Sequence, residues 1–138
     1  MYKRKNILKI AIDSPAAAGA GTLARTISKE YNLIYIDTGK IYRLIALYKL
    51  NNPKKFNIQF LKKKIKKLKI KDLDNKKLLS NEVGMEASKV ARQKNIRKLI
   101  YSFQKNFAYN PPKKYNGSCL DGRDITYKIV PNANFKFF

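Results

Sequence analysis

Apolar residues along this chain form short continuous runs that alternate with stretches of helical period. Short apolar runs bounded by polar or small residues predict buried strands, and apolar residues three or four positions apart predict amphipathic helices. The predicted strands are residues 7–12, 33–37, 118–120 and 133–138. The predicted helices are residues 22–31, 41–50, 56–70 and about 81–107. This alternation of strands and helices predicts an α/β fold built on a parallel sheet.

Residues that favour turns separate these elements. Thr38-Gly39 follows the second strand and predicts a turn. Asn51-Asn52-Pro53 and Asn110-Pro111-Pro112 end helices, because proline cannot continue one. Residues 72–80 are polar and predict a connector. The chain stops inside its last apolar run, at Phe137-Phe138, so we expect a truncated domain whose sheet is incomplete at the C-terminus.

Length and composition narrow the class of protein. A chain of 138 residues with 44% hydrophobic residues fits one domain with an ordinary core. Cys119 is the only cysteine, which excludes an intrachain disulfide, and the absence of histidine excludes His-based triads and zinc sites. We therefore expect no metal site made by the chain's own side chains. No apolar stretch reaches the length of a membrane span or of a signal-peptide core, so we expect a cytoplasmic protein without membrane contact.

The chain is strongly basic, with 31 Lys and Arg against 9 Asp and Glu and a net charge of +22. Such a charge is typical of proteins that bind polyanions. Lysine dominates, however, and a dedicated nucleic-acid surface usually includes arginine for bidentate contacts. We therefore favour compositional drift toward lysine, and keep a nucleic-acid surface as an alternative.

Residues 56–70 combine an apolar stripe with many lysines. Leu61, Ile65 and Leu68 share one face of the predicted helix. A basic amphipathic helix can lie on an anionic membrane or on nucleic acid. More often such a helix packs its apolar stripe on the core of its own domain, which is the interpretation we favour.

Residues 11–22 read Ala-Ile-Asp-Ser-Pro-Ala-Ala-Ala-Gly-Ala-Gly-Thr, between a predicted strand and a predicted helix. Strand, small-residue loop and helix is the context of a phosphate-binding loop, in which backbone N–H groups hold the phosphate at the helix N-terminus. The Walker pattern opens this loop with glycine and places lysine after its second glycine. Ser14 and Ala20 occupy those two positions, so the loop keeps its backbone frame but lacks the lysine.

Polar residues cluster after three of the predicted strands, at residues 13–22, 37–43 and 121–124. In parallel sheets, ligands bind beyond these C-terminal strand ends. Arg43 and Arg123 are two of only six arginines, and we interpret arginine here as a sign of bidentate contact with phosphate. For Asp13, at the end of the first strand, we expect a structural role.

Together these stretches resemble the bacterial cytidylate kinases, which are the (d)CMP kinases of the nucleoside monophosphate kinase group. The matching motifs are the loop of residues 10–25, Asp37-Thr-Gly-Lys-Ile-Tyr-Arg43, Glu86-Ala-Ser-Lys-Val-Ala91 with Arg97, Leu120-Asp-Gly-Arg-Asp-Ile125, and residues 130–138. The resemblance covers most of this chain but only the N-terminal and middle parts of the family's chain. It implies a P-loop NTPase-like parallel sheet flanked by helices, with residues 51–116 as a reduced, lysine-rich helical acceptor-binding region.

The resemblance also implies a reaction, in which ATP and CMP or dCMP give ADP and CDP or dCDP, with Mg²⁺ carried by ATP. It places the donor triphosphate on the loop Ser14, Pro15, Ala16, Ala17, Ala18, Gly19, Ala20, Gly21 and Thr22. It places the acceptor nucleotide on Thr38, Tyr42, Arg43, Ser88, Arg97, Arg123 and Asp124. The implied catalytic residues are Arg43 on the acceptor phosphate, Arg123, and Asp121 near Mg²⁺-bound water.

Three departures from the family pattern lead us to expect impaired activity. Ala20 replaces the loop lysine, and loss of a preorganised charge of this kind costs ~3–4 kcal/mol. Ser14 replaces a glycine, and the chain stops before the family's lid. Our hypothesis is a monomeric cytidylate kinase homologue that is inactive or transfers phosphoryl groups very slowly. The alternative is a non-catalytic basic protein that binds nucleic acid or nucleotide.

Overall fold

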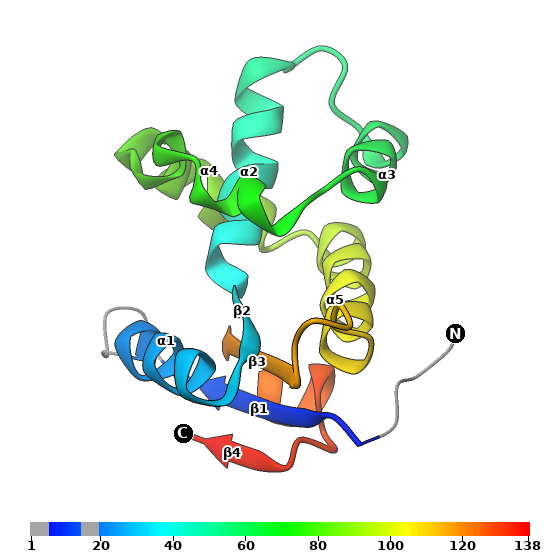
Figure 1. The fold of residues 1–138 in the computed structure, drawn as a ribbon. Helices are drawn as coiled ribbons and strands as arrows, with labels where there is room; N and C mark the ends of the chain where they lie inside the picture. Colours follow the sequence, from blue (N-terminus) through cyan, green and yellow to red (C-terminus); the bar gives the residue numbers. More distant parts are fainter. Residues whose placement is uncertain (1–5, 15–19) are drawn as a thin grey trace. The chain divides into compact units, whose positions relative to one another are not determined.

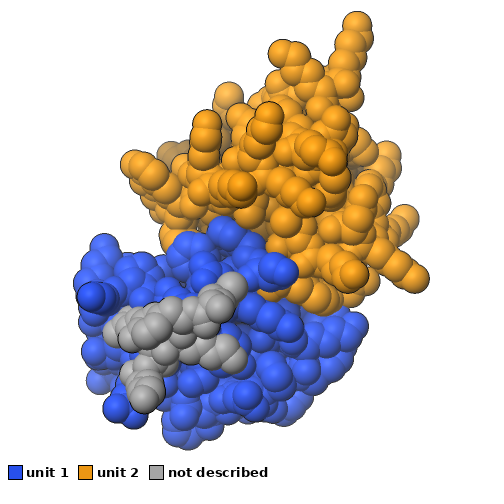
Figure 2. Space-filling model, turned by 90° about the vertical axis from the view of Figure 1, so that its right-hand side faces the viewer, with its two compact units in different colours: residues 1–38, 102–138 blue, residues 39–101 orange. Residues whose placement is uncertain are grey.

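The computed structural model describes residues 6–14 and 20–138 (Figure 1). The chain divides into two compact units, shown in different colours in Figure 2. Unit 1 consists of residues 1–38 and 102–138, and unit 2 consists of residues 39–101. Unit 1 is therefore built from two segments that lie far apart in the sequence.

A four-stranded parallel sheet forms the centre of unit 1 (Figure 1). Its strands are β1 (Leu8–Asp13), β2 (Leu33–Asp37), β3 (Gly117–Gly122) and β4 (Phe135–Phe137). Their order across the sheet is β2-β3-β1-β4, and every neighbouring pair is parallel. This arrangement confirms the predicted α/β fold with a parallel sheet.

The described residues form five α-helices. They are α1 (Ala20–Tyr31), α2 (Thr38–Asn51), α3 (Ile58–Lys66), α4 (Asn81–Val90) and α5 (Lys94–Tyr109). Short 3₁₀-helices span Ile70–Asp74 and Lys76–Leu79, and a single π-helical turn spans Ile125–Ile129. Along the described residues, no helix is both long and apolar enough to cross a membrane.

Both faces of the unit 1 sheet are covered. On one face Cys119 packs in a buried cluster with Ala24 of α1, and Ile10, Ile12 and Leu33 complete this cluster. The next side chain toward the start of the strand points to the opposite face, since strand residues alternate. There the Ser118 hydroxyl donates a hydrogen bond of 2.9 Å to the carbonyl oxygen of Ala108, near the end of α5.

The structure corrects two predicted boundaries. Thr38-Gly39 is the start of α2 and not a turn. The predicted helix of residues 56–70 is shorter, because Asn57 caps α3 by accepting a hydrogen bond of 2.8 Å from the Phe60 amide. The polar connector of residues 72–80 contains most of the two 3₁₀-helices.

A third correction concerns the long helix predicted for residues 81–107, which is interrupted between α4 and α5. The buried residues of α4 are Val83, Ala87 and Val90. In one continuous helix this stripe would continue through position 94 and positions 97 or 98, where the chain has charged residues. The buried isoleucines of α5 are instead Ile96 and Ile100. Because the apolar stripe changes face, two separate helices bury more apolar surface than one.

Unit 2 confirms the predicted orientation of the basic amphipathic helix. Leu61, Ile65 and Leu68 are buried, at 0%, 9% and 8% exposure. The lysines of α3 lie on its exposed side. The apolar stripe of α3 thus contributes to the core of unit 2, and its basic face is turned to solvent.

Replacing Gly117 tests the tight pairing of β1 with β3. A Cβ atom at position 117 would lie 1.8 Å from the Leu8 carbonyl oxygen, so the two strands must separate to admit it. We expect Gly117→Ala to lower the free energy of unfolding by about 1–3 kcal/mol, measured by urea denaturation. The matched control is Gly21→Ala, whose added Cβ meets nothing closer than 3.4 Å. The control should be neutral or slightly stabilising, and equal stability of the two variants would contradict the prediction.

Candidate functional site

The C-terminal ends of β1, β2 and β3 meet at one edge of the unit 1 sheet. In the strand register Asp37 pairs with Asp121, and Asp13 pairs with Gly122. Three carboxylates predicted from sequence to follow strands are therefore brought to the same edge. This is the edge at which parallel α/β sheets bind their ligands.

Asp121 is the most enclosed of these carboxylates, with 6% exposure. The phenol of Tyr35 donates a hydrogen bond of 2.7 Å to its Oδ2. The Thr38 hydroxyl donates one of 2.8 Å to its backbone carbonyl oxygen. Burial raises the pKa of Tyr35 well above its ordinary value, and the hydrogen bond and charge of Asp121 raise it further. Tyr35 therefore stays protonated and holds the Asp121 carboxylate in one orientation.

Tyr35 is a residue of this candidate site that the sequence does not single out. It lies in the apolar run of β2, a pattern that predicts only a buried strand. The available signal was its position two residues before Asp37, which places both side chains on the same face of β2. A phenol on that face and near the strand end is able to reach a carboxylate on the neighbouring strand.

Asp13 is committed to hydrogen bonds within unit 1. Its carboxylate accepts hydrogen bonds of 2.7 Å from the Ile125 amide and 2.6 Å from the Thr126 hydroxyl. These bonds tie the end of β1 to the π-helical turn that follows β3, in agreement with the structural role expected for Asp13. In the same region the Ser14 amide donates a hydrogen bond of 3.1 Å to the Gly122 carbonyl oxygen.

The segment Gly122-Arg123-Asp124 forms a tight bend after β3. Gly122 has a φ of 150°, and a Cβ there would lie 1.8 Å from the Thr38 hydroxyl oxygen, so only glycine fits. Asp124 has a left-handed φ of 64°. Its carboxylate accepts hydrogen bonds from the Tyr127 hydroxyl and, at 3.5 Å, from the Lys128 ammonium group. The Arg123 side chain is exposed.

The other predicted acceptor residues lie in unit 2. Arg43 on α2 donates a hydrogen bond of 2.7 Å from Nη1 to the Leu78 carbonyl oxygen, and its guanidinium group lies against Gly84 of α4. Ser88 donates a hydrogen bond of 3.3 Å to the carbonyl oxygen of that same glycine. The structure thus brings Arg43 and Ser88 to one stretch of α4.

Tyr42 and Arg97 occupy other positions in unit 2. Tyr42 precedes Arg43 on α2 and is half-buried. Arg97 lies on α5, where its Nη2 donates a hydrogen bond of 2.8 Å to the Tyr101 hydroxyl and its guanidinium lies over the Tyr101 ring. Arg97 is thus held against its own helix.

The predicted donor loop lies largely outside the described residues, which omit Pro15, Ala16, Ala17, Ala18 and Gly19. Ser14 follows β1, and Ala20, Gly21 and Thr22 form the first turn of α1. That first turn contains no acidic residue, so no carboxylate there repels a bound anion. In residues 6–14 and 20–138, no cluster of three or more Asp, Glu, Cys or His side chains is placed to hold a metal ion.

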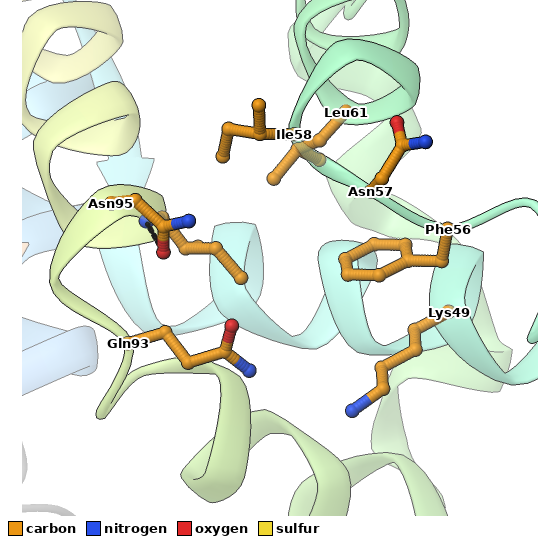
Figure 3. A pocket seen from close by; sticks show the side chains of 8 residues that line it. Lys49, Phe56, Asn57, Ile58, Leu61, Gln93 and Asn95 are labelled. Atoms are coloured by element: carbon orange, nitrogen blue, oxygen red, sulfur yellow. Dashed lines mark hydrogen bonds between the residues drawn. The ribbon is translucent and has the colours of Figure 1, made fainter.

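Unit 2 also contains a cavity of about 330 Å³, which no prediction from sequence included (Figure 3). Its eight lining residues are Lys49, Phe56, Asn57, Ile58, Leu61, Gln93, Asn95 and Ile96. In Figure 3 the Phe56 ring projects into the cavity, and the side chains of Gln93 and Lys49 extend toward each other below it. The cavity therefore combines an aromatic face with amide groups and with the Lys49 ammonium group, which forms an ion pair of 2.7 Å with Glu86.

A parallel sheet flanked by helices, in which β1 leads through small residues into α1, is the architecture of the P-loop kinases. The family model described as "Cytidylate kinase" matches residues 10–138. The chain belongs to the cytidylate kinase family.

Similar proteins support this assignment. The chain is 42% identical over 134 residues to a cytidylate kinase of Bartonella tribocorum, a match that covers 94% of this chain and 59% of that protein. It is 40% identical over 131 residues to one of Paramagnetospirillum magneticum, covering 94% and 61%. A cytidylate kinase of Mesorhizobium japonicum is 35% identical over 134 residues, covering 96% and 60%. The chain thus spans about three fifths of the length of the relatives it matches.

The contact between Tyr35 and Asp121 predicts a specific pH dependence of stability. Above about pH 10 the unfolded chain loses the phenolic proton while the folded chain keeps it, so folding stability falls as pH rises past that value. Tyr35→Phe removes both this dependence and the hydrogen bond to a buried carboxylate. We expect the variant to be about 1–3 kcal/mol less stable at neutral pH and to show a shallower decline above pH 10, measured by urea denaturation across pH.

Tyr31→Phe is the matched control, because Tyr31 is 55% exposed. This control should follow the unchanged chain at every pH. A Tyr35→Phe variant that declines as steeply as the unchanged chain would show that Tyr35 does not retain its proton in the folded state.

Proposed function

We propose that this chain binds ATP and CMP or dCMP and transfers the γ-phosphoryl group of Mg²⁺-ATP to the acceptor phosphate. Membership in the cytidylate kinase family supports the substrate pair, since the family uses ATP and Mg²⁺. The observation that carries the proposal is the strand edge where Asp121, held by Tyr35, lies beside the end of β1. There a carboxylate of fixed orientation adjoins the start of the donor loop.

The donor triphosphate is proposed to bind on residues 14–22. The hydrogen bond from the Ser14 amide to Gly122 fixes the start of this loop against the end of β3. At its other end, the amides in the first turn of α1 are free of intrahelical partners, as in every helix, and attract an anion. Asp121 is proposed to orient water on the Mg²⁺ that ATP carries.

The acceptor nucleotide is proposed to contact Thr38, Tyr42, Arg43, Ser88, Arg97, Arg123 and Asp124. Arg43 is assigned to its phosphate. A guanidinium group has five N–H donors, so the bond from Arg43 to the Leu78 carbonyl oxygen leaves donors for a phosphate and also orients the group. Ser88 and Arg123 are assigned to the cytosine, and Asp124 to the base or sugar.

The proposed reaction is a direct displacement. An oxygen of the acceptor phosphate attacks the γ-phosphorus, the bond from that phosphorus to the β-γ bridging oxygen breaks, and ADP leaves with CDP or dCDP as the second product. Such a reaction needs positioned substrates and neutralised charge, with no covalent enzyme intermediate. Alanine at position 20 supplies no charge to the donor phosphates, so we propose that transfer is slow. We also propose that the protein acts as a monomer in the cytoplasm, where nucleotides are available.

Restoring the loop lysine tests the proposed impairment. We expect Ala20→Lys to raise kcat/KM for ADP formation with CMP by about 10²–10³-fold, because a preorganised cation then meets the transferred group. Ala20→Met, which has similar length but no charge, is the control and should give no increase. A turnover of the unchanged chain within the ordinary kinase range of about 1–100 s⁻¹ would contradict the impairment.

Arg123→Ala tests acceptor binding separately from catalysis. Because the Arg123 side chain is exposed, its removal should leave the unfolding midpoint unchanged. We expect CMP affinity, measured by calorimetry, to fall about 10-fold or more through loss of a charge-assisted hydrogen bond. Arg92→Ala is the matched control, since Arg92 is exposed between α4 and α5 and has no proposed contact with CMP. Absence of CMP binding to the unchanged chain would overturn the proposed function.

A further inference from the structure

Lysine is locally concentrated in α3 and in the residues just after it. Seven lysines fall within residues 62–71, and this segment contains no acidic residue. Across the whole chain, Lys and Arg together account for only 31 of 138 residues. A uniform drift in composition does not produce such a local density, so the position of these lysines needs its own explanation.

Four of these lysines, Lys62, Lys63, Lys66 and Lys67, form a compact group that we call the α3 lysine face. They occupy two pairs spaced four residues apart, so their side chains lie on neighbouring turns on the exposed side of the helix. None of the four forms an ion pair with a described residue. Like charges at this spacing repel each other and destabilise a helix. A bound polyanion relieves this repulsion.

A membrane surface fits this face poorly. Helices that lie on membranes insert apolar side chains between lipids beside their cations. Leu61 and Ile65 of α3 are buried in unit 2, and Phe60 is half-buried with its ring tilted against Phe56. The face therefore offers much charge and little exposed apolar surface, which suits the phosphate backbone of a nucleic acid.

The cavity of unit 2 lies beside this face, because α3 contributes residues to both. Ile58 and Leu61 of α3 line the cavity, and Lys62 of the lysine face follows Ile58 by four residues, so these two side chains are neighbours on the helix surface. The Phe56 ring projects into the cavity, with the amide of Gln93 and the ammonium group of Lys49 below it (Figure 3). Lys49 is ion-paired with Glu86 at 2.7 Å, so the cations for a polyanion come from the lysine face and not from the cavity. Aromatic rings in basic grooves stack with unpaired bases, and side-chain amides hydrogen-bond to base edges.

We propose that unit 2 binds single-stranded nucleic acid, with the backbone phosphates on the α3 lysine face and one unpaired base stacked on Phe56 in the cavity. The lysine face supplies affinity that is independent of sequence and sensitive to salt. The cavity requires a base that is not held in a duplex. This activity is separate from the proposed phosphoryl transfer and does not depend on it.

The proposed binding of phosphates by the α3 lysine face is tested by replacing its four lysines with glutamine in the full chain. Binding to oligouridylate and oligodeoxythymidylate of about 12 nucleotides is measured by fluorescence anisotropy over a range of salt concentrations. Each phosphate neutralised in a single strand contributes about 0.7 to the slope of log K against log salt, so the variant should lose about 3 from that slope. The control variant replaces four exposed lysines outside the face, Lys29, Lys105, Lys113 and Lys136, and should keep the slope.

The proposed stacking of a base on Phe56 is tested by Phe56→Leu, and Phe56→Tyr tests whether another aromatic ring restores the binding. Loss of one stacked base should lower affinity about 5- to 100-fold without changing the salt slope, and tyrosine should restore it. If the face variant and the control variant lose the same amount from the slope of log K against log salt, the phosphates are not bound specifically by α3. Such a result would indicate a diffuse effect of net charge and would overturn the assignment of the phosphates to α3. Unchanged affinity in Phe56→Leu would overturn the base site. Binding to phosphatidylserine vesicles but not to either oligonucleotide would overturn the whole proposal.

Discussion

The parallel pairing of β3 between β2 and β1 is the constraint on which unit 1 depends. This strand comes from the second segment of the unit, so its insertion joins residues 1–38 to residues 102–138. The insertion requires close backbone approach, and Gly117 and Gly122 are the two positions where a Cβ atom would collide with the first segment. The same register sets Asp121 beside Asp37, so the geometry of the strand edge follows from how β3 enters the sheet.

Three neighbouring carboxylates at this edge differ in their surroundings. Asp13 accepts hydrogen bonds from an amide and a hydroxyl of the turn after β3, and these bonds stabilise that turn. The Asp121 carboxylate instead accepts a hydrogen bond from the half-buried phenol of Tyr35. Asp37 pairs with it in the register, and its charge also raises the pKa of Tyr35. A carboxylate removed from water needs hydrogen-bond donors, and the two carboxylates obtain them from different places. The donors to Asp13 belong to the turn after β3, so its role is structural. The donor to Asp121 is a phenol that orients it, in keeping with the ligand-facing role proposed for Asp121.

The local sequence predicted both ends of β2 correctly, because the polar residues Asn32 and Thr38 border its apolar run. It failed at Thr38-Gly39, since the start of α2 is fixed by a hydrogen bond from Thr38 to Asp121, 83 positions away. The π-helical turn after β3 was missed for the same reason, as Asp13 holds it from β1. The family motifs identified candidate site residues but could not identify Tyr35, whose role depends on a partner in another strand.

The composition alone could not distinguish a drift toward lysine from a lysine surface selected for binding, because it counts every lysine equally. The positions of the lysines in the structure add two observations. The negative end of the helix dipole favours cations in the last turn of α3, which accounts for Lys63 and Lys66 but not for Lys62. Lys64 lies over the rings of Tyr48 and Phe60, so its charge has an internal role. The lysines of the α3 lysine face repel one another at a cost in helix stability, and the nucleic acid that we propose as their partner would offset this cost.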